Sequence, residues 1–100
     1  MVLGRVTGSV VSSHKEKLLE GSTFLIVEKV DATTMKGTGD YVVAIDAVGA
    51  GTGELVFYVS GSSARMTAAT SGRPADATIT AIVDQVTLGD KSVFRKDRPQ

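Results

Sequence analysis

The apolar residues of this 100-residue chain fall in short runs, and each run is ended by a glycine, a proline or a polar stretch. Within the runs Val, Ile and Ala dominate, and apolar and polar residues often alternate. Small and β-branched residues repeating with a period of two predict β-strands. Strands are predicted at residues 2–11, 23–30, 41–48, 54–60 and 78–87.

One helix is expected between the fourth and fifth strands. Ser62 is suited to cap a short helix that continues through small residues to Ala69. Five short strands and one helix favour a small closed barrel, because closure removes the sheet edges that promote aggregation. A two-sheet sandwich fits the same pattern of strands. The predicted fold class is therefore all-β.

The remaining segments are interpreted as connections and a tail. Residues 32–40 contain Lys-Gly-Thr-Gly and predict a flexible hairpin tip. Residues 1–88 are interpreted as the barrel domain. Residues 89–100 are charged apart from Val93 and Phe94, and they are interpreted as a C-terminal tail with one apolar anchor, a candidate to pack on a neighbouring subunit.

Composition excludes several classes of function. Eleven basic residues balance eleven acidic ones, and a general nucleic-acid binder usually needs an excess of positive charge. The chain has no cysteine, which leaves no disulfide framework and no thiolate metal site. The first residues do not read as a signal peptide, and no apolar run approaches the ~18 residues that span a bilayer.

Two short segments invite catalytic or nucleotide-binding interpretations, which their surroundings argue against. The glycines of residues 49–53 precede a predicted strand, whereas a dinucleotide fingerprint opens a helix and a phosphate loop continues with Gly-Lys-Ser/Thr. Ser63 lacks the spacing of a nucleophile elbow, and the single histidine, His14, lies in a polar stretch. No enzyme, cofactor or metal site is predicted.

The two segments are more informative in combination than either is alone. The first reads Asp-Ala-Val-Gly-Ala-Gly-Thr-Gly-Glu over residues 46–54, and after a strand the second reads Gly-Ser-Ser-Ala-Arg over residues 61–65. The combination resembles the hallmark of bacterial microcompartment vertex proteins, the family of EutN and CcmL. The resemblance covers about nine-tenths of the chain. It departs at Ala75, where a larger apolar residue is common, at residues 33–40 and from Gly89 onward.

The resemblance implies an OB-like barrel that assembles into a homopentamer and caps the vertices of a polyhedral protein shell. The expected role is structural, with no cofactor. The expected partners are further copies of the chain and hexameric and trimeric shell proteins, with neither nucleic acid nor membrane. The expected location is the shell of a microcompartment in the cytoplasm.

A ring needs one face of each subunit to meet a different face of the next. Glycine and alanine would let backbones approach closely, the serines would add hydrogen bonds, and Arg65 could offer its guanidinium to Asp46 or Glu54 across the contact. Arg65 could instead pair within its own subunit. The residues predicted at the subunit interface are Asp46, Gly49, Ala50, Gly51, Gly53, Glu54, Gly61, Ser62, Ser63, Ala64 and Arg65.

The alternative function is an OB-type module that binds single-stranded nucleic acid. Such modules combine a basic groove with exposed aromatic side chains. Phe24 and Phe57 lie in apolar runs and are expected in the core, and no predicted strand interleaves aromatic residues with Lys or Arg. The sequence therefore favours the shell protein over the binding module.

Overall fold

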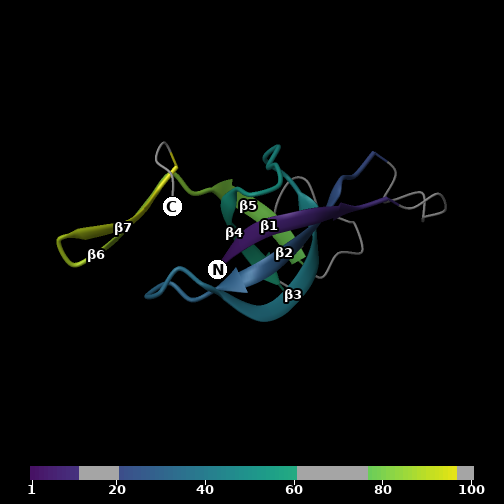
Figure 1. The fold of residues 1–100 in the computed structure, drawn as a ribbon. Coiled ribbons are helices and arrows are strands. Elements are labelled where there is room, and N and C mark those ends of the chain that lie inside the picture. Colours follow the sequence, from purple (N-terminus) through teal and green to yellow (C-terminus); the bar gives the residue numbers. More distant parts are fainter. Residues whose placement is uncertain (12–20, 61–76, 97–100) are drawn as a thin grey trace.

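A computed structural model describes residues 1–11, 21–60 and 77–96 of the chain. Five of its strands close into a barrel in the order β1-β2-β3-β5-β4, and two form a separate hairpin, β6-β7 (Figure 1). The all-β class and the closed five-stranded barrel are thereby confirmed, and the sandwich is excluded. The predicted helix over residues 62–69 lies outside the described residues. The strands are β1 (Val2–Val10), β2 (Phe24–Val30), β3 (Gly37–Asp46), β4 (Leu55–Ser60), β5 (Ala77–Ile82), β6 (Gln85–Leu88) and β7 (Lys91–Arg95).

Strand pairing explains how so short a chain closes a barrel. β1 pairs antiparallel with β2 on one side and with β4 on the other, and β4 pairs antiparallel with β5. The last gap is closed by a short parallel contact between β3 and β5, in which Ile45 lies opposite Thr78. Register shifts in three of the antiparallel pairs of the barrel mark bulges or irregularities, which can bend a sheet enough to close it.

The apolar core has two parts. The larger part fills the barrel and is built from inward-facing residues of all five strands. Its members are Val6, Leu25, Val27, Ala44, Val56, Tyr58, Ala77 and Ile79. The smaller part joins barrel residues to the hairpin. Its members are Leu3, Val30, Leu55, Val83 and Phe94.

The single strand predicted over residues 78–87 is wrong, because the chain leaves the barrel at Val83. The Val83 N–H donates to the Leu55 carbonyl at 2.8 Å, and the Val83 side chain is buried in the smaller core part. β6 begins two residues later and pairs with β7 instead of with a barrel strand. The predicted tail thus contains a strand, and its Phe94 packs on the barrel of its own subunit.

The predicted hairpin tip at residues 32–40 is shifted toward the N-terminus. β3 already begins at Gly37, and the turn lies before it. The Asp31 carboxylate organises that turn by accepting hydrogen bonds from the Thr33 N–H at 2.8 Å, the Thr33 hydroxyl at 2.6 Å and the Thr34 N–H at 3.3 Å. These bonds lower the pKa of Asp31, with the Thr33 hydroxyl contributing most. A polar side chain, and not the Lys-Gly-Thr-Gly sequence, therefore sets the turn.

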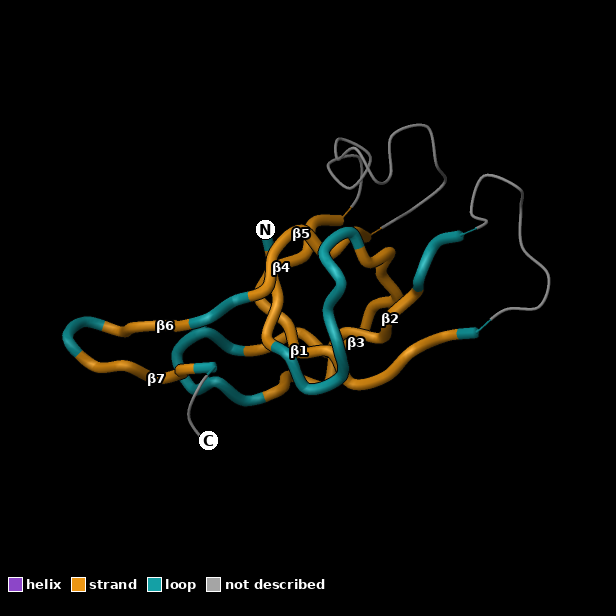
Figure 2. The backbone as a smooth tube through the Cα atoms, turned by 90° about the horizontal axis from the view of Figure 1, so that it is seen from above, coloured by secondary structure: helices purple, strands orange, loops and turns teal. Residues whose placement is uncertain are grey.

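The hairpin β6-β7 extends away from the barrel (Figures 1 and 2). Phe94 is 6% exposed and fixes the base of the hairpin to the barrel. The aromatic core differs from the prediction in this respect. Phe24 and Phe57 are only half-buried, whereas Tyr58 and Phe94 are the buried aromatic residues.

Candidate subunit interface

The connection between β3 and β4 contains five of the predicted interface residues. The sixth, Asp46, ends β3 and organises the first half of the connection. One carboxylate oxygen of Asp46, Oδ1, accepts backbone N–H groups from Val48 and Gly49 at 3.0 Å each and from Ala50 at 3.2 Å. A side chain that satisfies three successive backbone donors fixes a turn that has no strand partner. The Asp46 backbone N–H donates to the Thr23 carbonyl at 2.9 Å and ties this turn to the residue just before β2.

Two of the glycines are required by backbone conformation. Gly49 has φ of 78° and Gly53 has φ of 92°, in the left-handed region that residues with a Cβ rarely adopt. The Gly53 N–H donates to the Val6 carbonyl at 2.8 Å, and the Val6 N–H donates to the Glu54 carbonyl at 3.0 Å. The loop is therefore fastened to β1 at its second end.

Gly51 is different, because its φ is not in the left-handed region. A Cβ at Gly51 would meet only Glu54 Oε1, at an ordinary contact distance of 3.5 Å. Neither conformation nor packing in the described part of the subunit therefore requires glycine at this position. This makes Gly51 a useful probe of what approaches the loop from outside.

Glu54 links the loop to the end of the hairpin. Its Oε1 accepts the Gly51 N–H at 2.7 Å, and its Oε2 lies 2.9 Å from Lys96 Nζ. Lys96, followed by the Gly51 N–H, lowers the pKa of the Glu54 carboxyl below its ordinary value of 4.5, and Glu54 raises the pKa of Lys96. The loop and the residue after β7 thus share one surface.

Arg5 adds a second link between the same two parts. Its Nη1 donates to the Gly53 carbonyl at 3.0 Å, and its guanidinium lies 5.6 Å from the centre of the Phe94 ring. Residues of the loop, β1 and β7 surround a cavity of about 390 Å³. Neither Arg5 nor Lys96 could be predicted at this site, because nothing in their local sequence indicates a contact with the loop.

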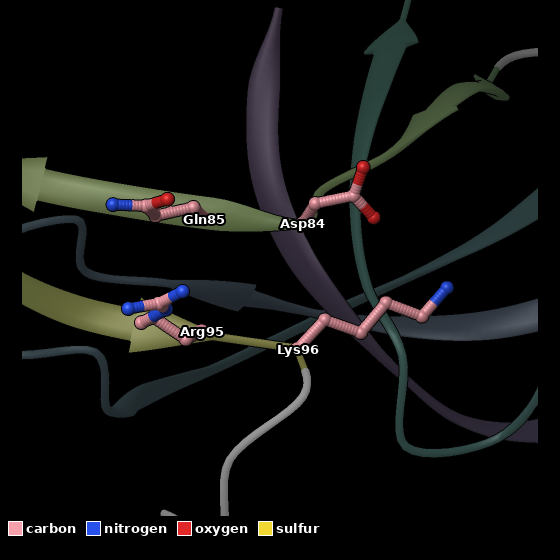
Figure 3. Close-up of a pocket in the computed structure, with 4 residues that line it drawn as sticks. All are labelled: Asp84, Gln85, Arg95 and Lys96. Atoms are coloured by element: carbon pink, nitrogen blue, oxygen red, sulfur yellow. The ribbon is translucent and has the colours of Figure 1, made fainter.

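A second recess, of about 550 Å³, lies at the base of the hairpin (Figure 3). Its lining residues are Asp84, Gln85, Arg95 and Lys96. Figure 3 shows the Asp84 and Lys96 side chains directed to one side, away from those of Gln85 and Arg95.

Within residues 1–11, 21–60 and 77–96 no group of three or more His, Asp or Glu side chains is placed to hold a metal ion. The same residues include no helix of the length and apolarity needed to cross a membrane.

The structure brings Asp46, Gly49, Ala50, Gly51, Gly53 and Glu54 together in one loop. The other predicted interface residues, Gly61, Ser62, Ser63, Ala64 and Arg65, lie outside the described residues. The two carboxylates expected to face Arg65 have partners in their own subunit, since Asp46 holds the loop backbone and Glu54 holds Lys96.

The Glu54–Lys96 contact gives a prediction about pH. Because the pKa of Glu54 is lower in the folded chain than in the unfolded one, the contact stabilises the fold above about pH 4.5 and is lost as the pH falls through the lowered pKa. In an NMR titration the Glu54 carboxyl is expected to titrate below 4.5 in the unmodified chain and closer to 4.5 in Lys96→Met. The matched control is Lys36→Met, and a midpoint that Lys96→Met leaves unchanged would contradict the contact.

The fold and the loop define a class of small closed barrels, and comparisons with known proteins identify the family. The family model described as "Ethanolamine utilisation protein EutN/carboxysome" matches residues 1–84. The bacterial microcompartment shell vertex protein EutN of Salmonella typhimurium is 44% identical over 96 residues, which cover 96% of each chain. The solved structure of Gloeobacter violaceus CcmL matches with a TM-score of 0.92 and 39% identity, covering 98% of this chain and 100% of that one. A pentameric microcompartment shell protein, GrpN from Rhodospirillum rubrum, matches with a TM-score of 0.79 and 40% identity, covering 88% and 99%.

The chain therefore belongs to the EutN/CcmL family. It is a structural shell vertex protein and not an enzyme, as the resemblance of residues 46–54 and 61–65 implied.

Proposed function

We propose that the chain forms a homopentamer that occupies the five-fold vertices of a bacterial microcompartment shell. The observation that carries this proposal is the match over 88% of the chain to the pentameric shell protein GrpN. A flat layer of six-fold tiles cannot close into a polyhedron without five-fold points. A small barrel that forms a ring of five meets that geometric need.

The ring's partners in the shell are hexameric and trimeric shell proteins, and the shell lies in the cytoplasm. The neutral formal charge of the chain supports close contact between identical copies, because they repel one another weakly. The proposal includes no cofactor, no membrane and no nucleic acid among the partners.

Residues 46–54, with residues 61–65, form part of the contact between neighbouring subunits in this proposal. The loop suits such a contact because its backbone is held from within by Asp46 and Glu54 and its glycines leave little side-chain bulk. A preorganised backbone loses little entropy when a neighbour docks on it. Arg65 is proposed to donate a hydrogen bond across the contact. Asp46 Oδ1 and both carboxylate oxygens of Glu54 already have partners in their own subunit, so its acceptor is expected to be another atom.

Gly51→Leu tests the interface directly. The subunit is expected to fold normally, because φ at Gly51 is not left-handed and a Cβ there makes no close contact. Assembly is expected to weaken by about tenfold or more, since overpacking a close contact costs about 1–3 kcal/mol. The measurement is the fraction of pentamer by native mass spectrometry over a range of concentrations.

The matched control is Ala32→Leu, which adds similar bulk at an exposed position of the β2–β3 turn. It is expected to leave the pentamer intact. Full assembly of a correctly folded Gly51→Leu protein would remove the loop from the interface without removing the vertex function.

The single-stranded nucleic-acid module is not favoured as a second function. Tyr41 is the one aromatic residue among the five in the chain that is classed as exposed, at 62%, whereas base stacking along a groove uses several. A salt-dependent gel shift with a single-stranded oligonucleotide would reopen that alternative.

A further inference from the structure

The turn between β2 and β3 holds one residue in a strained backbone conformation. Met35 has φ of 60°, and it is the one residue other than glycine with positive φ among residues 1–11, 21–60 and 77–96. The left-handed region is unfavourable for an L-residue that carries a Cβ, and glycine or asparagine is the usual choice there. Such a conformation persists where the surrounding contacts compensate for it.

Two hydrogen bonds and one packed side chain supply these contacts. The Met35 N–H donates to the Asp31 carbonyl at 2.7 Å, and the Asp31 N–H donates to the Lys36 carbonyl at 2.9 Å, which closes the turn. The Met35 side chain is half-buried, whereas every other residue from 31 to 40 is exposed. It packs against the smaller core part, which also holds the base of the hairpin β6-β7. Met35 therefore joins the β2–β3 turn to the hairpin.

The chemistry of the thioether gives this contact a further property. Hydrogen peroxide oxidises methionine to its sulfoxide: the sulfur gains one oxygen atom, the O–O bond of the peroxide breaks, and water is released. A half-buried side chain is within reach of a small oxidant from solvent. The sulfoxide oxygen is a polar acceptor that needs a hydrogen-bond donor. The smaller core part provides no side-chain donor, because its members are Leu3, Val30, Leu55, Val83 and Phe94.

We propose that Met35 is an oxidation site that controls how firmly the hairpin β6-β7 is held on the barrel. The sulfoxide must leave the apolar core for water, and the packing that offsets the left-handed backbone of Met35 is then lost. The turn is expected to relax, and the base of the hairpin is expected to open to water. Reduction of the sulfoxide regenerates the thioether, so the change is reversible. The inference concerns the single subunit and does not depend on the ring.

The test is treatment of the protein with hydrogen peroxide. Trypsin cleavage after Lys29 and Lys36 places Met35 in a peptide of its own, apart from Met1 and Met66, so mass spectrometry assigns the added oxygen atom. Oxidation of Met35 is expected to raise the equilibrium constant for unfolding of the subunit by about tenfold, as an unpaired polar group in an apolar core does. Urea denaturation measures this constant.

Hydrogen exchange locates the effect. Amide exchange in β7 is expected to become faster once Met35 is oxidised, because β7 contains Phe94 at the base of the hairpin. Met35→Leu, which keeps an apolar side chain without sulfur, is expected to retain both its stability and its exchange rates under the same treatment. Met66→Leu keeps Met35 and is expected to respond to peroxide as the unmodified chain does.

A second pair of variants needs no oxidant. Met35→Gln places a polar group at the same position and is expected to reproduce the loss of stability. Ala32→Gln adds the same side chain at an exposed position of the same turn and is expected to change nothing.

Three results would overturn the inference and leave the vertex function standing. They are complete oxidation of Met35 with unchanged stability and exchange, an equal loss in Met35→Leu, and a Met35 that stays reduced while the exposed Met1 is oxidised. If Met35→Leu does not fold, the oxidised Met66→Leu protein is treated with a methionine sulfoxide reductase. Stability is expected to return, and a loss that persists after Met35 has been reduced would equally overturn the inference.

Discussion

Phe94→Ala is expected to lower the free energy of unfolding of the subunit by about 3–5 kcal/mol, the usual cost of removing a buried aromatic side chain. Phe94 is almost fully buried against Leu3, Leu55 and Val83, and it also lies beneath the Arg5 guanidinium. Its loss would leave a cavity between the barrel and the hairpin and would release the base of the hairpin. The effect should therefore reach both subunit stability and assembly.

Urea denaturation followed by circular dichroism measures this effect. Because assembly adds a concentration-dependent contribution to stability, unfolding is measured at several protein concentrations and extrapolated to the isolated subunit. Leu88→Ala is the matched control, since it truncates an exposed apolar side chain of the same hairpin. It is expected to change subunit stability by no more than about 0.5 kcal/mol. Equal losses in the two variants would show that Phe94 does not anchor the hairpin.

Gly4→Ala is expected to destabilise the subunit by about 1–3 kcal/mol, through overpacking. Gly4 is buried on β1, and a Cβ there would overlap Val27 Cγ1 and lie 3.0 Å from both the Glu28 carbonyl oxygen and Tyr58 Cε1. The carbonyl belongs to paired backbone and cannot move independently of β2. The barrel must therefore shift to accept a single methyl group.

Gly8→Ala, on the same strand, is the matched control. The nearest atom to a Cβ at Gly8 is Ile26 Cδ1 at 3.9 Å, an ordinary contact distance, and φ at Gly8 is not left-handed. Alanine there is expected to be neutral or to stabilise by about 0.4–1 kcal/mol, because it restricts the unfolded chain. The same denaturation experiment should thus give a clear loss at Gly4 and none at Gly8. A neutral Gly4→Ala would mean that β1 and β2 are packed less closely than described.

The barrel strands could be predicted because each combines a short apolar run with a local breaker. The end of β5 could not, because no glycine or proline separates Ile82 from Val86. What separates β5 from β6 is tertiary: Val83 turns into the smaller core part and bonds to the Leu55 carbonyl. A pattern of period two carries no information about when a strand changes partner.

The burial of Phe94 could not be predicted from the sequence for a related reason. It lies in a segment that is charged on average, so composition indicated a tail, and only the packing of Leu3 and Leu55 at the barrel end provides a place for it. The loop of residues 46–54 could be predicted because glycine at alternate positions is unusual. The contacts of Arg5 and Lys96 with this loop could not be predicted. Arg5 lies 48 residues from its acceptor Gly53, and the hydrogen bond between them depends on the register of the closed barrel.

The central claim is that identical barrels close head-to-tail into a ring of five, and the native mass of the unmodified protein tests it most directly. Each subunit has a mass of 10.4 kDa, so native mass spectrometry in a gentle buffer is predicted to show one dominant species of about 52 kDa. A protein that stays at 10.4 kDa at high concentration, or that forms a ring with another number of subunits, would contradict the account.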